Sequence, residues 1–211
     1  MIDPELADSE RVLALNYAPK SRRAALGTLW QLDETLGRVV ATTTEPVIGQ
    51  IRLTWWHERL SGLTAGEASG EPLLGRLAEH VLPYDVTGTD LAMLIEGWEA
   101  LLELPLDDAA LAIFADQRGG MLFALSARIL SAEVPPIAGQ GWALVDFAAH
   151  CSDPKIAASA LAMVAERLRD HPTMPRPLRI LSRLASARSR LWARSMGASL
   201  PRFVFLRAVL G

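Results

Sequence analysis

Residues 107–132 read DDAALAIFADQRGGMLFALSARILSA and decide the fold class. Apolar residues fall on nearly every side of a helix drawn through this segment, and such a helix is buried over most of its surface. We therefore expect it to run through the centre of an all-α protein. Gly119 and Gly120 lie in its middle, where each glycine costs about 1 kcal/mol in helix propensity. Close approach of a second backbone would compensate for that cost, and a kink beside a cavity is the alternative.

The rest of the chain has the same helical character. Ala and Leu dominate, and no segment alternates with period two between apolar and polar residues. The 211 residues, 50% of them hydrophobic, suffice for one domain with a sizeable core. We predict a single all-α domain over residues 1–211, with Asp3 and Pro4 starting its first helix. The expected helices cover residues 4–15, 21–41, 46–63, 72–82, 88–104, 107–132, 137–150, 153–170, 176–195 and 201–209.

Composition limits where the protein works. No run of about 18 uncharged apolar residues occurs, so no transmembrane helix is predicted. Residues 1–20 are acidic and lack a basic segment followed by an apolar block, which argues against a secretory signal. Cys151 is the single cysteine and favours a reducing compartment. We expect a cytoplasmic protein, with a peripheral position on a membrane as the alternative.

Charge is distributed unevenly along the chain. No acidic residue follows Asp170, whereas eight arginines do, so the net charge of −3 divides into +8 after Asp170 and −11 up to it. A basic region docked on an acidic body would explain this pattern, and so would a surface for an anionic membrane or an acidic protein partner. Nucleic acid is not expected as a partner, because no recognised DNA- or RNA-binding motif accompanies the arginines.

Residues 51–60, IRLTWWHERL, combine two tryptophans with two arginines. At about 100° per residue, Arg52 and Arg59 fall within the apolar face to which Trp55 and Trp56 belong. A buried guanidinium needs a partner, since an unpaired charge in a low-dielectric interior costs several kcal/mol. The sequence therefore predicts a nearby carboxylate.

Asp33 is the expected partner. It lies inside the apolar arc of the helix predicted over residues 21–41, so we predict that it pairs with Arg52 or Arg59 across a helix interface. The two tryptophans would then form the apolar walls of the site and contact the cations through their rings. Such a pair would either fix the register of the two helices or form part of an anion-binding cavity.

Four segments of the chain are distinctive in their order: APKSRRAALGTLWQLDETLGRV, EPVIGQIRLTWWHERL, DQRGGMLFALSARIL and GQGWALVDFA. Together they resemble the squalene/phytoene synthase family over residues 10–150. More particularly, the chain resembles a divergent branch with an IRLxWW helix, which also contains a mitochondrial complex I assembly factor. The resemblance implies an all-α isoprenoid synthase bundle around a central cavity for two prenyl diphosphates. Relative to a typical synthase of the family, the chain is shortened in its C-terminal part.

The family's chemistry, as the resemblance implies it, depends on two aspartate-rich stretches. Their carboxylates bind Mg²⁺, and the metal ions hold the diphosphate leaving group. The first stretch should follow LWQLDE, but Gly37, Arg38 and Ala41 stand at the positions expected to be acidic. The second should follow GWALVDFA, near residues 150–154, where the sequence reads DFAAHCSDP. No metal site is predicted there, and Asp146 and Asp153 are the candidate ligands if one exists.

Two functions are compatible with this pattern. Loss of both metal-binding stretches predicts a protein without prenyltransferase chemistry or cofactor, which acts in binding or assembly and could hold an apolar or prenyl ligand. The alternative is an active Mg²⁺-dependent prenyl diphosphate transferase of isoprenoid biosynthesis with unconventional ligands. No side chain stands out as catalytic. The candidate cavity residues are Trp30, Asp33, Glu34, Arg52, Trp55, Trp56, Arg59, Gln117 and Phe123.

Overall fold

The computed structural model describes residues 6–65, 70–164, 167–168 and 173–195. These residues form helices and connecting turns, with no strand among them, as the sequence predicted. The α-helices are α1 (Ser9–Leu15), α2 (Lys20–Ala41), α3 (Pro46–Ser61), α4 (Pro72–His80), α5 (Gly88–Ala92), α6 (Leu94–Glu99), α7 (Asp108–Ile113), α8 (Met121–Ile129), α9 (Pro136–His150), α10 (Pro154–Ala162) and α11 (Arg176–Ser195). Two short 3₁₀ helices, η1 (Leu82–Tyr84) and η2 (Ala100–Leu102), and one π-helix, η3 (Phe114–Gly120), complete them.

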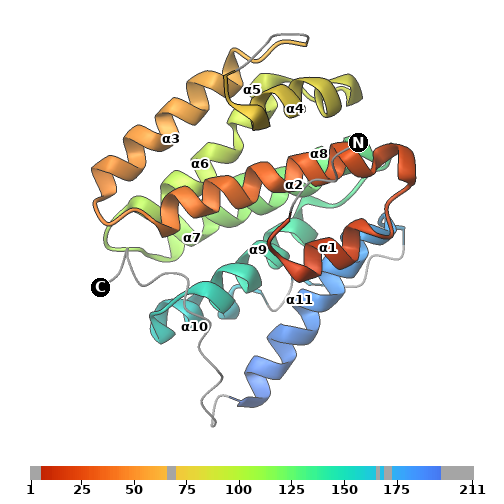
Figure 1. Cartoon of the computed structure of the whole chain (residues 1–211). Coiled ribbons are helices and arrows are strands. Elements are labelled where there is room, and N and C mark those ends of the chain that lie inside the picture. The colour runs from red at the N-terminus through yellow and green to blue at the C-terminus, as the bar shows by residue number, and fades with distance from the viewer. Residues whose placement is uncertain (1–5, 66–69, 165–166, 169–172, 196–211) are drawn as a thin grey trace.

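The long helix α2 crosses the middle of the molecule (Figure 1). Helices α3, α4 and α5 lie on one side of it, and α9, α10 and α11 lie on the other (Figure 1). The run α7–η3–α8 is the central segment that the sequence predicted, and η3 packs against both α6 and α9. One apolar cluster joins the layers, and its members include Leu29 of α2, Phe114 of η3 and Leu144 of α9.

Gly119, one of the two central glycines, lies at a close contact between two backbones. A Cβ atom on Gly119 would lie 2.3 Å from the carbonyl oxygen of Gly139, and one on Gly139 would lie 2.1 Å from that of Gly119. Helices η3 and α9 therefore meet backbone to backbone, which confirms the predicted close approach. The segment is not one regular α-helix, because Phe114–Gly120 forms a π-helix between α7 and α8.

Helix boundaries differ from the predictions at several ends. The first described helix begins at Ser9, where the Asp8 side chain accepts a hydrogen bond from the Glu10 amide, and residues 6–8 before it are not helical. The segment predicted as one helix over 88–104 is divided into α5, α6 and η2, and α10 ends at Ala162. The predicted Asp3–Pro4 start and the helix predicted over 201–209 lie outside the described residues. Within the described part, none of the helices has the length and apolarity that crossing a bilayer requires.

Candidate functional site

A buried ion pair between α2 and η3 lies at the centre of the molecule. The Arg118 guanidinium donates from Nε to Asp33 Oδ1 at 2.9 Å and from Nη2 to Asp33 Oδ2 at 2.9 Å. Their side chains are 2% and 0% exposed, respectively. The two parallel bonds form the bidentate geometry that gives arginine–carboxylate pairs their strength and fixed orientation.

Asp33 has two further donors. Arg11 lies on α1, and its side chain is 4% exposed. It donates from Nη2 to Asp33 Oδ2 at 2.5 Å. The indole Nε1 of Trp98 donates to Asp33 Oδ1 at 3.0 Å. The carboxylate of Asp33 thus accepts from three side chains on three different elements, which compensates for the loss of its hydration.

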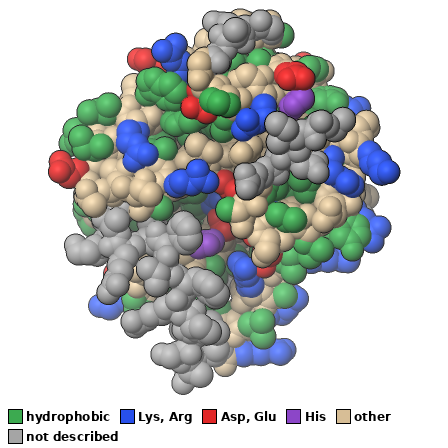
Figure 2. Space-filling view, viewed as in Figure 1, with side chains coloured by type: hydrophobic (Ala, Val, Ile, Leu, Met, Phe, Trp, Pro, Cys, Tyr) green, Lys and Arg blue, Asp and Glu red, His purple; other side chains and the backbone are tan. Residues whose placement is uncertain are grey.

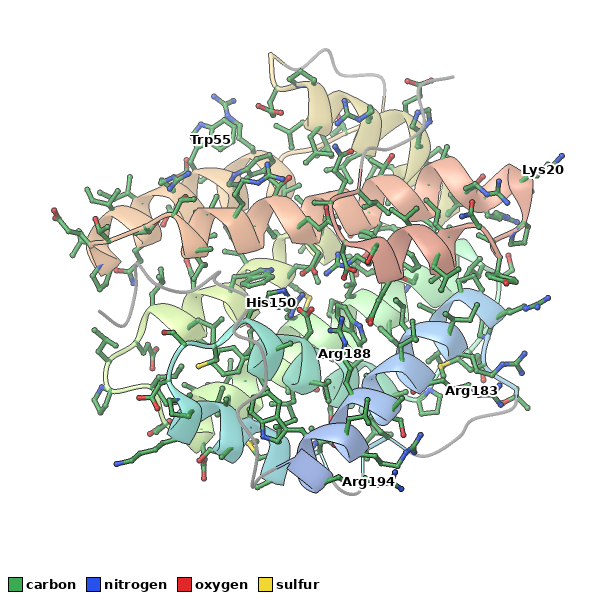
Figure 3. The ribbon with its side chains drawn as sticks, turned by 60° about the horizontal axis from the view of Figure 1, so that its bottom comes forward. Lys20, Trp55, His150, Arg183, Arg188 and Arg194 are labelled. Atoms are coloured by element: carbon green, nitrogen blue, oxygen red, sulfur yellow. The ribbon has the colours of Figure 1, made fainter. Side chains whose placement is uncertain are left out.

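Asp146 on α9 completes the group. Arg118 Nη2 lies 2.7 Å from Asp146 Oδ2, so the same nitrogen bridges the carboxylates of Asp33 and Asp146. We call Arg11, Asp33, Arg118 and Asp146 the charge core; its two cations and two anions sum to zero. His150 Nδ1 lies 3.6 Å from Asp146 Oδ1, and its side chain is 40% exposed, so the charge core approaches the surface at His150 (Figure 3).

Aromatic rings surround the Arg118 guanidinium. Its central carbon lies 4.3 Å from the Trp98 ring centroid, 5.1 Å from that of Phe114 and 4.8 Å from that of Trp142. Arg118 Nη1 has no hydrogen-bond acceptor among the described residues. The ring faces supply negative quadrupole density around the guanidinium and so stabilise its charge in place of water.

The pKa values of the charge core follow from this packing. Burial alone would raise the pKa of Asp33, but the guanidiniums of Arg118 and Arg11 outweigh it and lower that pKa. Burial likewise acts to raise the pKa of Asp146, yet Arg118 and His150 bring it down to about 2. The neighbouring carboxylates raise the pKa of Arg118 against the effect of burial. Asp33, Asp146 and Arg118 therefore carry their charges at neutral pH.

The family model described as squalene/phytoene synthase matches residues 5–209. The chain belongs to the squalene/phytoene synthase family. This match extends the resemblance beyond residue 150 and through α11. Searches of curated proteins and of solved structures found no match.

The charge core lies in two of the segments that carried the resemblance to the family. Asp33 belongs to the LWQLDE segment that precedes the expected first aspartate-rich stretch, and Asp146 belongs to GWALVDFA, which precedes the second. Their carboxylates face each other across Arg118, whose guanidinium connects the two segments. A side-chain cation thus joins carboxylates of the two segments, LWQLDE and GWALVDFA.

The predicted partners of Asp33 are wrong. Arg52 and Arg59 are both exposed. Arg52 Nη1 donates to the Thr43 hydroxyl at 3.2 Å and to the Val39 carbonyl at 3.4 Å, beside the C-terminal end of α2. The helical projection at about 100° per residue misplaced these cations because α3 carries apolar residues on two faces. The face that contains Leu53 and Leu60 is the buried one.

The candidate cavity residues have different environments. Trp30 and Phe123 are each 1% exposed in the core, and Trp30 Nε1 donates to the Ser126 hydroxyl at 3.1 Å. Trp56 is 7% exposed, as expected for a buried position. Trp55 is 41% exposed, so the prediction that it lies on the buried face is wrong. Trp55 projects outward from α3 (Figure 3), and Gln117 is half-buried in η3.

The remaining acidic candidates have local structural partners. Glu34 accepts hydrogen bonds from the Ala7 amide at 2.8 Å and the Asp8 amide at 3.2 Å, which ties the segment before α1 to α2. Asp153 caps α10 and accepts from the Lys155 amide at 2.8 Å. Among the residues that the structure describes, no group of three or more His, Cys, Asp or Glu side chains could hold a metal ion.

Sequence reasoning missed Arg11 and Arg118. A signal for Arg118 was present, since it is a cation inside a segment predicted to be buried on most sides. Arg11 had a weaker signal: it shares the helical face of Ala14 and Leu15, both of which are buried. Sequence alone could not pair them, because Arg118 is 85 residues from Asp33 along the chain.

Proposed function

We propose that this protein is a non-catalytic member of the squalene/phytoene synthase family that acts in binding or assembly. The observation that carries the proposal is the bridge of Arg118 Nη2 to Asp33 Oδ2 at 2.9 Å and to Asp146 Oδ2 at 2.7 Å. A magnesium ion would need carboxylate oxygens free to coordinate it. Here a guanidinium already occupies the space between these oxygens and neutralises them.

The other acids near the expected stretches support the same proposal. Glu34 holds the backbone amides of Ala7 and Asp8, and Asp153 holds the first turn of α10. These bonds use both carboxylate oxygens of Glu34 and Oδ1 of Asp153, so a metal ion at those oxygens would compete with them. Each acid considered for the transferase alternative therefore has a structural role that competes with metal coordination.

Calorimetry tests this proposal. Titration of Mg²⁺ into the protein, with and without farnesyl diphosphate, is expected to give no metal-dependent heat, and incubation with farnesyl diphosphate is expected to give no prenyl product. Metal-dependent binding that is abolished in Asp146→Asn but kept in Asp108→Asn, an exposed carboxylate on α7, would contradict the proposal. That result would favour the Mg²⁺-dependent transferase.

The binding part of the proposal is supported by α11. Its apolar side, which includes Leu181 and Ala185, is buried against the body of the protein. Arg188 pairs with Glu10 of α1 at 2.7 Å, so part of the basic charge serves to dock the helix. Arg190 and Arg194 are exposed, and Figure 3 shows Arg194 at the outer edge of the molecule. An outward arginine face of this kind fits an anionic membrane surface or an acidic protein partner.

Co-sedimentation with vesicles tests the membrane version. Wild-type protein should bind vesicles that contain phosphatidylserine more tightly than neutral vesicles, and salt should weaken this binding. The double variant Arg190→Gln/Arg194→Gln should bind roughly thirtyfold less tightly, because two basic residues near the surface contribute about 1 kcal/mol each. The matched control Arg38→Gln/Lys155→Gln removes the same charge from exposed positions elsewhere. Equal losses in both variants, or indifference to lipid charge, would contradict a role for α11.

A further inference from the structure

Helix α3 presents an apolar face to the outside of the molecule. Four large side chains on that face are 64%, 48%, 61% and 41% exposed: Val47, Ile48, Ile51 and Trp55, respectively. We call them the α3 stripe. They fall within an arc of about 100° and extend roughly 12 Å along the helix. Figure 1 shows α3 at the outer edge of the molecule, and Figure 2 shows hydrophobic side chains on that part of the surface. A contiguous exposed apolar patch marks an interaction site.

Charged residues follow one edge of the α3 stripe. Glu45, Arg52 and Arg59 are seven residues apart and all exposed, so they lie near one another in angle around the helix. The acidic residue stands at the N-terminal end of this edge and a cation at its C-terminal end. The Arg59 guanidinium lies 5.7 Å from the Trp55 ring centroid, which places its charge beside the stripe.

We propose that the α3 stripe binds the α3 stripe of a second copy of this chain, with the two helices antiparallel. A two-fold axis across the stripe brings Glu45 of one copy beside the partner's Arg59 and, by symmetry, forms the same pair a second time. A parallel arrangement would place ends of like charge together. Arg52, near the middle of the edge, is directed to Thr43 and the Val39 carbonyl of its own chain, and so does not face its counterpart.

The charges favour a second copy over a lipid surface as the occupant. Glu45 lies at the edge of the α3 stripe. Glu58 lies within the same arc of the helix, beyond the C-terminal end of the stripe, and both side chains are exposed. With Arg52 and Arg59 these carboxylates leave no net positive charge beside the α3 stripe to attract an anionic membrane. A second copy, by contrast, offers Arg59 to Glu45. The inference does not depend on the proposed loss of catalysis, since the α3 stripe and the charge core are separate parts of the molecule.

Sedimentation velocity over a range of concentrations tests the inference on the full chain. Wild-type protein should show a reversible monomer–dimer equilibrium. Ile51→Glu, Glu45→Arg and Arg59→Glu should each weaken dimerisation on the order of tenfold or more. The double variant Glu45→Arg/Arg59→Glu exchanges the two charges and should restore most of the wild-type affinity.

Leu191→Glu provides the matched control, because Leu191 is 60% exposed on α11, away from α3, and should leave the equilibrium unchanged. Circular dichroism should show unchanged helix content in every variant, since each altered side chain is exposed. A monomer at all concentrations would overturn the inference. So would a charge-exchanged double variant that dimerises no better than the single variants, because the antiparallel pairing requires rescue.

Discussion

At the scale of single residues, Asp33 is the group on which the others depend. It accepts from Arg11, Arg118 and Trp98, and its side chain has no exposed surface. A buried ion pair contributes little net stability when it is compared with well-packed apolar residues, but removal of one partner leaves the other buried without compensation. Replacement of the whole charge core by well-packed apolar residues should therefore change the stability little, whereas replacement of any one member should lower it strongly.

Asp33→Ala is expected to lower the free energy of unfolding by about 3–5 kcal/mol, because it leaves two buried guanidiniums without their shared carboxylate. Equilibrium unfolding in urea measures this change. Asp108→Asn removes an exposed carboxylate and should change the same free energy by less than about 0.5 kcal/mol. A loss in Asp33→Ala no larger than in this control would show that the ion pairs are not formed in solution.

The carboxyls of the charge core also predict a pH dependence. Their pKa values in the folded protein lie below those in the unfolded chain, and that of Asp146 is about 2. The stability that they contribute is therefore present above about pH 4 and lost as the pH falls through the folded values. The urea midpoint should fall steeply from about pH 4 toward pH 2. Asp146→Asn should flatten this slope, and an unchanged slope in that variant would contradict the assignment.

At the scale of elements, the contact between η3 and α9 permits little change. A Cβ on Gly119 would lie 2.3 Å from the Gly139 carbonyl oxygen, so Gly119→Ala must separate the two backbones. We expect a loss of at least about 2 kcal/mol in unfolding free energy, as for other overpacked cores. Gly75→Ala on α4, where an added Cβ meets nothing within 4 Å, should instead stabilise by about 0.5–1 kcal/mol. Equal effects of the two variants in urea unfolding would refute the close approach.

The same elements show what the sequence could reveal. Helical periodicity and the paired glycines were enough to predict an all-α fold, a central segment over 107–132 and its close backbone contact. They could not orient α3, because residues such as Ile51 and Leu53 are equally apolar, and only packing decides which is buried. They could not find the partners of Asp33 either, since α1, α2 and η3 meet only when the chain is folded.

At the scale of the whole molecule, the charge core connects α1, α2, η3 and α9 within one apolar cluster. Helix α11 joins the same cluster through Leu178 and Leu181, and the Arg188–Glu10 pair ties it to α1. Helix α11 thus packs on the folded body with its inner side and carries the exposed Arg190 and Arg194 on its outer side. Docking on the acidic body and binding of an anionic surface therefore do not exclude each other.

Because one core joins these elements, the protein should unfold in a single cooperative transition. Far-UV circular dichroism follows all helices, whereas tryptophan fluorescence follows the surroundings of the six tryptophans, of which Trp98 and Trp142 lie beside Arg118. The two signals should give the same urea midpoint, and Asp33→Asn should shift both by the same amount. Loss of the fluorescence signal at a lower urea concentration than the helix signal would mean that the charge core opens while its helices persist. The core would then be a local feature of the fold and not the connection that holds the bundle together.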